Sequence, residues 1–234
     1  MNAAPVLATT ALSALLAFIV SYAIGSIPWA YTIVRLVTGE DVTAHGTGNV
    51  GAMNVRRTTD SWAWFVVAMV ADVLKGVLPV GVFKYLALGT LLTPTGVAVS
   101  GVLGDGALPM AAVAGAVFGH NYSAWMALIK GRFARTGKGL ATGAGALLAY
   151  DWRYFVAVVT VGLLTIAVTR YMMAGQVTAA FTLPVAAALL RSPDWPFALA
   201  MGLVVYGAHH RRFIGLLRGQ EPKFYIHDRS GPRG

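Results

Sequence analysis

The chain has 234 residues, of which 57% are hydrophobic and only 12% are charged, with a formal net charge of +9. A soluble domain carries about a quarter charged residues, so this composition excludes a soluble globular protein and predicts a polytopic membrane protein. The basic residues lie between apolar segments, where they set topology and meet lipid headgroups or anionic substrates. We find no nucleic-acid motif and expect no nucleic-acid partner, and the absence of cysteine excludes disulfides, thiolate metal sites and a cysteine nucleophile.

The first apolar segment, 7–34, is uncharged and long enough to cross a bilayer of about 30 Å. It lacks the positively charged start of a cleavable signal peptide, so we expect it to be the first membrane span. Ser26 and Pro28 in its later half predict either a simple kink or a polar feature at the mouth of a site.

A polar stretch follows at about 38–60, and its central part is rich in glycine. Gly46, Gly48 and Gly51 fall within six residues and precede Arg56 and Arg57. Such a loop exposes backbone N–H groups beside fixed positive charge, which suits an oxyanion such as phosphate. The alternative is an ordinary polar turn between two hydrophobic helices.

The second span is expected to begin at residue 61. Asp72 and Lys75 lie inside it, three residues apart and therefore on one helix face. Charges at that depth are costly unless they pair or face a wet cavity, so they indicate either a functional site or a structural ion pair. Residues 85–104 are broken by Gly and Pro and predict a helix end with a loop or short helix.

A further span is expected at 106–129, and a basic loop follows it at 130–138. The span contains His120 and Asn121, and a histidine there is either hydrogen-bonded to a neighbour or part of the site. The basic loop leads into a second glycine motif with Gly137, Lys138 and Gly139, which has similar chemistry to the first.

Four more uncharged segments, 139–150, 154–169, 171–190 and 195–208, complete an all-α fold of about seven transmembrane helices in a single domain, 1–234. Residues 139–150 are too few to span unless the segment continues or runs between other helices. With the N-terminus outside, only Lys84, Arg153 and Arg191 of the 18 Lys and Arg residues fall on the outer side. Both glycine loops and the tail, about 209–234, then face the cytoplasm and form a cationic pocket for phosphorylated molecules, backed by a bundle that could hold an acyl chain.

Several motifs, in the same order along the chain, resemble one family. They are 25–28 (GSIP), 45–57 (HGTGNVGAMNVRR), 72–76 (DVLKG), 119–120 (GH), 137–142 (GKGLAT), 170–171 (RY) and the tail from His210 to Lys223. Together they look like the bacterial acyl-phosphate:glycerol-3-phosphate acyltransferases, the PlsY family. The resemblance implies transfer of a fatty acyl group from acyl phosphate to the sn-1 hydroxyl of glycerol 3-phosphate, in phospholipid synthesis at the bacterial inner membrane.

The resemblance also implies site residues, without a cofactor or metal. The expected catalytic residues are His210, Asn54, Arg57 and Glu221. The expected substrate-binding residues are Ser26, Thr47, Gly48, Asn49, Gly51, Lys75, His120, Asn121, Gly137, Lys138, Gly139 and Thr142. In this hypothesis Lys138 and its flanking N–H groups hold one phosphate, Arg57 and the backbone of 47–51 hold the other, and Asn54 donates to the oxyanion. The proton acceptor is His210 or a substrate phosphate oxygen.

The chain departs from the family pattern at several polar positions. Thr43 stands where the family has arginine, and Arg56 or Arg135 is a candidate to replace its charge. Met173 and Gln176 stand where serines are common, and Phe213 where asparagine is expected. About six extra residues separate His120 from the second glycine loop. These departures predict a divergent member.

The alternative function is a non-catalytic membrane protein that binds lipid or transports a small anion, with Asp72 and Lys75 lining a pathway. Against it, the sequence shows no inverted repeat. The sequence does not predict the acyl-chain preference or the oligomeric state.

Overall fold

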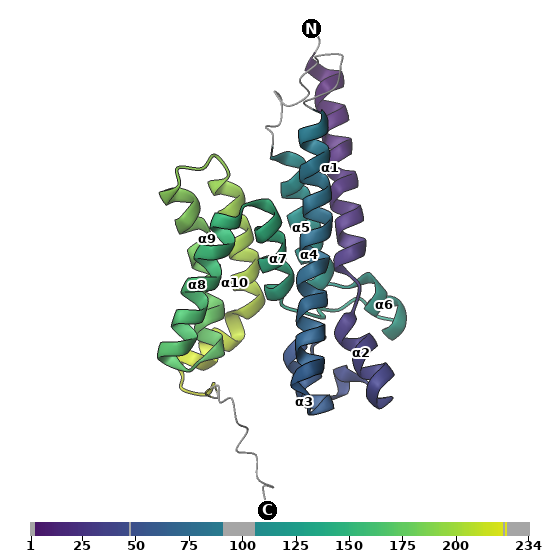
Figure 1. Cartoon of the computed structure of the whole chain (residues 1–234), viewed down its shortest axis with the longest axis vertical. Helices are drawn as coiled ribbons and strands as arrows, with labels where there is room; N and C mark the ends of the chain where they lie inside the picture. The colour runs from purple at the N-terminus through teal and green to yellow at the C-terminus, as the bar shows by residue number, and fades with distance from the viewer. Residues whose placement is uncertain (1–2, 47, 91–105, 222, 224–234) are drawn as a thin grey trace, which may run out of the picture. The chain divides into compact units, whose positions relative to one another are not determined.

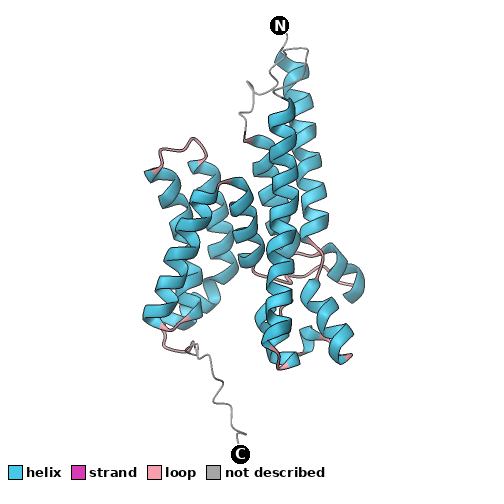
Figure 2. Cartoon of the chain, in the orientation of Figure 1, coloured by secondary structure: helices cyan, strands magenta, loops and turns pink. Residues whose placement is uncertain are grey.

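All regular structure in the described residues, 3–46, 48–90, 106–221 and 223, is helical in this computed structural model (Figure 2). The elements in chain order are α1 (Ala3–Gly25), α2 (Trp29–Thr38), the 3-10 helix η1 (Val42–Ala44), α3 (Ala52–Thr59), α4 (Trp62–Thr90), α5 (Ala107–Asn121), α6 (Ala124–Lys130), α7 (Leu140–Tyr150), α8 (Trp152–Thr169), α9 (Met172–Leu189) and α10 (Trp195–Leu217). The predicted all-α fold is confirmed. The chain divides into two compact units, 1–155 and 156–234, and the single domain predicted for the whole chain stays a prediction.

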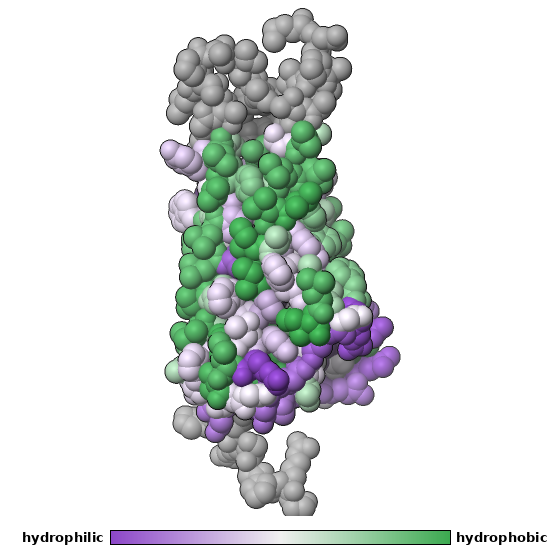
Figure 3. All heavy atoms as spheres, turned by 90° about the vertical axis from the view of Figure 1, so that its right-hand side faces the viewer, coloured by the Kyte–Doolittle hydropathy of each residue, from purple (hydrophilic) through white to green (hydrophobic). Residues whose placement is uncertain are grey.

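Long apolar helices with outward-facing leucine and valine mark the chain as a membrane protein. Four described segments are long and apolar enough to cross a membrane: Ala11–Thr38, Trp62–Ala87, Trp152–Thr169 and Met172–Leu189. Leu12, Leu16 and Leu78 are each more than half exposed, as expected for side chains that face lipid. On the face shown in Figure 3, hydrophobic side chains cover most of the surface and hydrophilic ones gather toward one end. The predicted count of seven spans and the orientation stay predictions.

Close helix packing through glycine builds the first unit, in which α1, α4 and α5 run side by side (Figure 1). Gly115 and Gly119 of α5 lie against the backbone carbonyls of Phe18 and Tyr22 of α1, where an added Cβ would collide. Gly145 of α7 meets the carbonyl of Val73 of α4 in the same way. Because lipid gives helices no hydrophobic reason to associate, such small-residue contacts supply the packing between them.

Two predicted spans are each broken into two helices, which corrects the sequence analysis. The first, 7–34, stops at Gly25 and restarts at Trp29, because Pro28 has no N–H to continue the helix. The third, 106–129, stops at Asn121, and Ser123 caps a new helix by accepting a hydrogen bond from the Met126 N–H at 3.1 Å. These breaks give α2 and α6 directions independent of the helices before them.

The polar region 38–60 is more ordered than a loop. Asp41 caps η1 by accepting a hydrogen bond from the Thr43 N–H at 2.9 Å, and α3 ends at Asp60 in a left-handed conformation with φ 50°. The first glycine loop therefore connects two short helical elements and is held at both ends.

The second unit contains most of α8 together with α9 and α10. Thr165 of α8 and Thr178 of α9 share a hydrogen bond of 3.1 Å, and Phe181 of α9 packs on Tyr206 of α10. Helix α10 continues to Leu217, nine residues beyond the predicted end at 208. Of the helix end and loop or short helix predicted at 85–104, residues 85–90 belong to α4, and 91–104 lie outside the described residues, as do the tail residues 224–234.

Candidate active site

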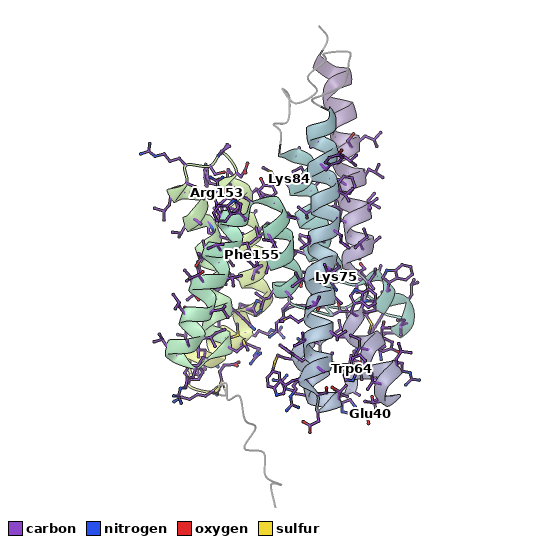
Figure 4. All side chains as sticks on the ribbon, viewed as in Figure 1. Glu40, Trp64, Lys75, Lys84, Arg153 and Phe155 are labelled. Atoms are coloured by element: carbon purple, nitrogen blue, oxygen red, sulfur yellow. The ribbon has the colours of Figure 1, made fainter. Side chains whose placement is uncertain are left out.

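The two glycine loops are joined by a backbone hydrogen bond. Val50 in the first loop donates its N–H to the carbonyl of Thr136 in the second at 2.9 Å, although 86 positions separate them in the sequence. The prediction that these loops share one surface is confirmed. Figure 4 shows Glu40 and Trp64, which flank the first loop, at one end of the first unit, with Lys84 and Arg153 toward the other.

Asn54 organises the first loop from inside. It is fully buried at the start of α3, and its Nδ2 group donates to the carbonyls of Val42, His45 and Asn49 at 2.7, 3.0 and 3.1 Å. Its amide protons are thereby used by the loop, so donation to an oxyanion would require the loop to open. Thr47, another predicted site residue, lies outside the described residues.

The absence of a side chain at Gly46 leaves room for the Arg57 side chain to lie against the first loop. Gly46 has φ 54°, and a Cβ built there would collide with Oδ1 of Asn54 and lie 3.2 Å from Cδ of Arg57. Arg57 is exposed at the end of α3. The exposed Arg57 side chain therefore lies against Gly46, in a loop that also carries Gly48, Asn49 and Gly51.

The second loop is pinned to the end of α5. Thr136 donates its N–H to the Asn121 carbonyl at 2.7 Å and its Oγ1 hydroxyl to the His120 carbonyl at 2.9 Å. Gly137 lies directly against the His120 ring, and a Cβ there would collide with it. Arg135 closes the turn by donating Nε to the Gly137 carbonyl at 3.1 Å.

Helix α7 begins in this loop, so its N-terminus is part of the loop. Gly139, with φ 72°, is the N-cap of α7, and an added Cβ would lie 3.0 Å from Oδ1 of Asn121. Lys138 precedes it and is partly buried. A lysine beside the first N–H groups of a helix is a suitable arrangement for binding an anion.

Buried charged groups connect the bundle to the second loop. The ion pair predicted from helix spacing is present, with Nζ of Lys75 2.8 Å from Oδ1 of Asp72, and Lys75 also donates to the Ile27 carbonyl at 3.0 Å. Nδ1 of His120 lies 3.7 Å from the same Asp72 oxygen and 3.2 Å from Oγ1 of Thr142. Of the two interpretations of Asp72 and Lys75, these contacts favour the structural ion pair.

Ser26 holds the broken α1 segment against α6. It is 1% exposed, its carbonyl accepts a hydrogen bond from the Ser123 hydroxyl, and its own hydroxyl accepts one from the Ala124 N–H at 3.4 Å. Of the two interpretations of the Ser26–Pro28 region, the kink is the one that these contacts support.

The predicted catalytic residues of the tail belong to the second unit. His210 is exposed, and its Nδ1 contacts the Gly207 carbonyl at 2.8 Å, which requires a proton on Nδ1 and leaves Nε2 as an acceptor when the ring is neutral. Glu221 accepts a hydrogen bond from Nε of Arg212 at 2.9 Å, and Lys223 lies 5.9 Å from the ring centre of Tyr171. The tail therefore folds back on α10 and reaches the turn that holds Arg170.

The positions that depart from the family pattern differ in their contacts. Met173 is buried, Phe213 packs on Tyr206, and the buried Oε1 of Gln176 has no hydrogen-bond donor among the described residues. Arg56 forms an ion pair with Asp60 and lies 5.1 Å from the Trp62 ring, contacts that direct it toward α4.

Sequence reasoning missed the ion pair between Lys130 and Asp41. Burial alone would raise the pKa of Asp41, but hydrogen bonds from Lys130 and Thr43 outweigh it and lower the pKa from 3.8 to about 2. The partners are 89 positions apart in the sequence, and no local pattern pairs them.

Comparison with known proteins identifies the family. A family model described as glycerol-3-phosphate acyltransferase matches residues 15–219. A glycerol-3-phosphate acyltransferase of Synechococcus sp. (strain JA-3-3Ab) is 37% identical over 214 residues, which cover 91% of this chain and 94% of the relative. The chain belongs to the glycerol-3-phosphate acyltransferase family. A further member, from Desulforudis audaxviator, is 32% identical over 218 residues, or 92% of this chain and 98% of that member.

Two solved structures of an acyltransferase in this family share the fold. Both are of PlsY (YgiH), described as an integral membrane glycerol 3-phosphate acyltransferase. The glycerol 3-phosphate form has a TM-score of 0.73 and 26% identity, and covers 91% of this chain and 96% of that chain. The lysophosphatidic acid form has a TM-score of 0.71 and 25% identity over the same shares.

Proposed function

We propose that this acyltransferase moves a fatty acyl group from acyl phosphate to the sn-1 hydroxyl of glycerol 3-phosphate, giving lysophosphatidic acid and inorganic phosphate. Family membership supports the reaction class. The observation that carries the proposal is the Val50–Thr136 hydrogen bond, because it puts two cationic, glycine-rich loops side by side. A reaction between two phosphorylated molecules needs two such sites within reach of each other.

The second loop is our candidate for the glycerol 3-phosphate site. Lys138 supplies a positive charge next to the N-terminus of α7, and Gly139 contributes a backbone N–H group, whereas the Gly137 N–H donates to the Asn121 carbonyl at 3.4 Å. His120, Asn121 and Thr142 hold this loop in place, and we assign them positioning roles.

The first loop is our candidate for the acyl phosphate site. The Arg57 side chain lies against Gly46 in this loop, and Asn49 and Gly51 follow in the same loop, whereas the Gly48 N–H donates to the His45 carbonyl at 2.9 Å. Asn54 keeps the loop folded, so we assign it a positioning role in place of the predicted oxyanion donor. Ser26 and Lys75 act at greater distance, by fixing α1 and α4.

The chemistry is a direct acyl transfer. The sn-1 oxygen bonds to the acyl carbon, the bond from that carbon to the phosphate oxygen breaks, and phosphate leaves with the electron pair. The hydroxyl proton goes to Nε2 of His210 or to a phosphate oxygen of a substrate. Glu221 would fix the tail through Arg212 and so position His210.

We also infer the setting of the reaction. The basic loops, the tail and the positive-inside rule favour an active site facing the cytoplasm of a bacterial inner membrane, where membrane lipids surround the bundle. The exposed leucines and valines of the long helices support insertion of the bundle in a lipid bilayer.

A direct assay tests the function. Purified protein given acyl phosphate and glycerol 3-phosphate should release phosphate and lysophosphatidic acid in equal amounts. No turnover, together with uptake of an anion into protein-containing vesicles, would favour the transporter alternative.

The side-chain base is tested separately. His210→Ala should lower kcat by about a hundredfold or more, because a positioned general base contributes about that much. Full activity of this variant across pH 5 to 9 would assign the proton to a substrate phosphate oxygen.

A further inference from the structure

Lys130 connects α6 to the start of the first glycine loop. Its Nζ donates to Oδ2 of Asp41, 89 positions earlier in the chain, and lies 5.6 Å from the ring centre of Tyr31 in α2. The Lys130 and Asp41 side chains are 28% and 30% exposed, so the pair is partly shielded from solvent. Such a pair is stronger than a fully exposed one.

Asp41 is built into the first loop. Its other oxygen, Oδ1, accepts hydrogen bonds from the N–H and the hydroxyl of Thr43 at 2.9 and 2.6 Å. The next residue, Val42, gives its carbonyl to Asn54, which also holds His45 and Asn49. A displacement of Asp41 is therefore transmitted directly to the loop.

Lys130 stands at the start of the second loop. It is the last residue of α6, and Gly131, with φ 65°, ends the helix and begins the turn toward Lys138. The contacts that join the two loops include Val50 with Thr136 near their centres and Asp41 with Lys130 at their starts. One hydrogen bond leaves two segments free to pivot, and a second attachment removes that freedom.

Other cations near the loops have different partners. Arg56 contacts Asp60 and Trp62, and Arg135 donates to the Gly137 carbonyl within its own loop. The charge that neutralises Asp41 comes from Lys130, at the end of α6.

We propose that the Asp41–Lys130 ion pair acts as a latch, by which we mean that it fixes the position of the two glycine loops relative to each other. Both residues are therefore positioning residues for substrate. The assignment of a substrate to each loop rests on the proposed function, whereas the contact between the loops does not depend on it.

Hydrogen exchange tests the latch without any substrate. In detergent micelles, Lys130→Met should speed amide exchange in peptides covering 45–51 and 131–139. The matched control is Arg153→Met, which breaks the Arg153–Asp151 pair at the start of α8 and should leave both peptides unchanged. Unchanged exchange in Lys130→Met would overturn the latch, and so would equal changes in the control.

Kinetics test the consequence for substrate. Asp41→Asn keeps an oxygen for Thr43 but removes the charge, and Lys130→Met keeps the side-chain length. Each should raise the glycerol 3-phosphate KM about fivefold with little change in kcat, which matches the loss of one partly exposed ion pair. The double variant should be no worse than either single one, and Lys130→Arg should restore the wild-type KM.

The outcomes separate the two proposals. Additive effects in the double variant, or an unchanged KM in both single variants, would reject the latch. Absence of turnover in the wild-type protein would reject the proposed function, and the exchange measurement would still decide the latch.

Discussion

Lys138 places a single positive charge beside the first turn of α7, in the loop assigned to glycerol 3-phosphate. Removing one partner of a charged hydrogen bond costs about 1.5–3 kcal/mol, so Lys138→Ala should raise the glycerol 3-phosphate KM about ten- to a hundredfold. Initial-rate kinetics with saturating acyl phosphate measure this change, with Arg153→Ala as the control for charge loss. An unchanged KM would remove Lys138 from the site.

Asp41 predicts a pH dependence of stability. Its pKa is about 2 in the folded protein against an ordinary value of 3.8, so its charge stabilises the fold above about pH 4, and this contribution is lost as the pH falls toward 2. Because the side chain is partly exposed, the contribution is at most about 1 kcal/mol. Denaturant unfolding followed by tryptophan fluorescence should find Asp41→Asn less stable than wild type at pH 5, with the difference shrinking as the pH falls through 2. A difference that stays constant with pH would contradict this assignment.

The sequence could predict the contacts of some single residues but not of others. The Asp72–Lys75 pair follows from a spacing of three on one helix, and the contact of His120 with a neighbouring side chain was one of two readings left open. The Lys130–Asp41 pair was out of reach, since neither local spacing nor charge indicates which distant partner a lysine selects. Asn54 resembles a donor to substrate in the sequence, and only the fold shows that its protons are used by the loop.

At the scale of elements, glycine contacts determine how closely α4 and α7 approach. A Cβ built at Gly76 of α4 would collide with the Thr142 carbonyl and lie 2.7 Å from the Ala146 nitrogen, whereas one built at Gly81 meets nothing within 4 Å. Gly76→Ala should therefore destabilise the protein by about 1–3 kcal/mol, as overpacked cores do.

The control on the same helix is Gly81→Ala, which should stabilise the protein slightly, because alanine favours helix over glycine by about 1 kcal/mol. Thermal unfolding in detergent should shift the midpoint in opposite directions for the two variants. Shifts of the same sign and size would show that α4 and α7 do not depend on this contact.

Helix boundaries were the weakest part of the sequence prediction. Hydropathy identifies 7–34 and 106–129 as continuous apolar segments, and it does not register that Pro28 and Ser123 start new helices. Both corrections lie next to the site, because α2 and α6 are the pieces that carry Tyr31 and Lys130 toward Asp41. Apolar content therefore predicted which segments are helical, while capping and proline chemistry decided where the helices end.

At the scale of the whole molecule, the predicted orientation is open to a direct test, because the chain has no cysteine. Glu40→Cys and Arg153→Cys, at opposite ends of the first unit (Figure 4), provide two single labelling sites. In intact cells a membrane-impermeant maleimide should label Arg153→Cys but not Glu40→Cys, and disruption of the membrane should expose both. The reverse pattern would place the glycine loops outside.

Composition and ordered motifs were sufficient for the class of protein and its family, because both depend on sums over the chain or on short local patterns. The arrangement of the two loops depended on contacts between residues far apart in the sequence. The sequence predicted that the two glycine loops meet. In the structure, the hydrogen bond between Val50 and Thr136 joins them.

That bond has a thermodynamic consequence. If each loop binds one phosphorylated molecule, occupancy of either loop alters the free energy of the other through the shared Val50–Thr136 contact. Linkage then requires that glycerol 3-phosphate change the affinity for a non-reactive acyl phosphate analogue by the same factor as the analogue changes the affinity for glycerol 3-phosphate. Calorimetric titrations in both orders would measure this heterotropic coupling.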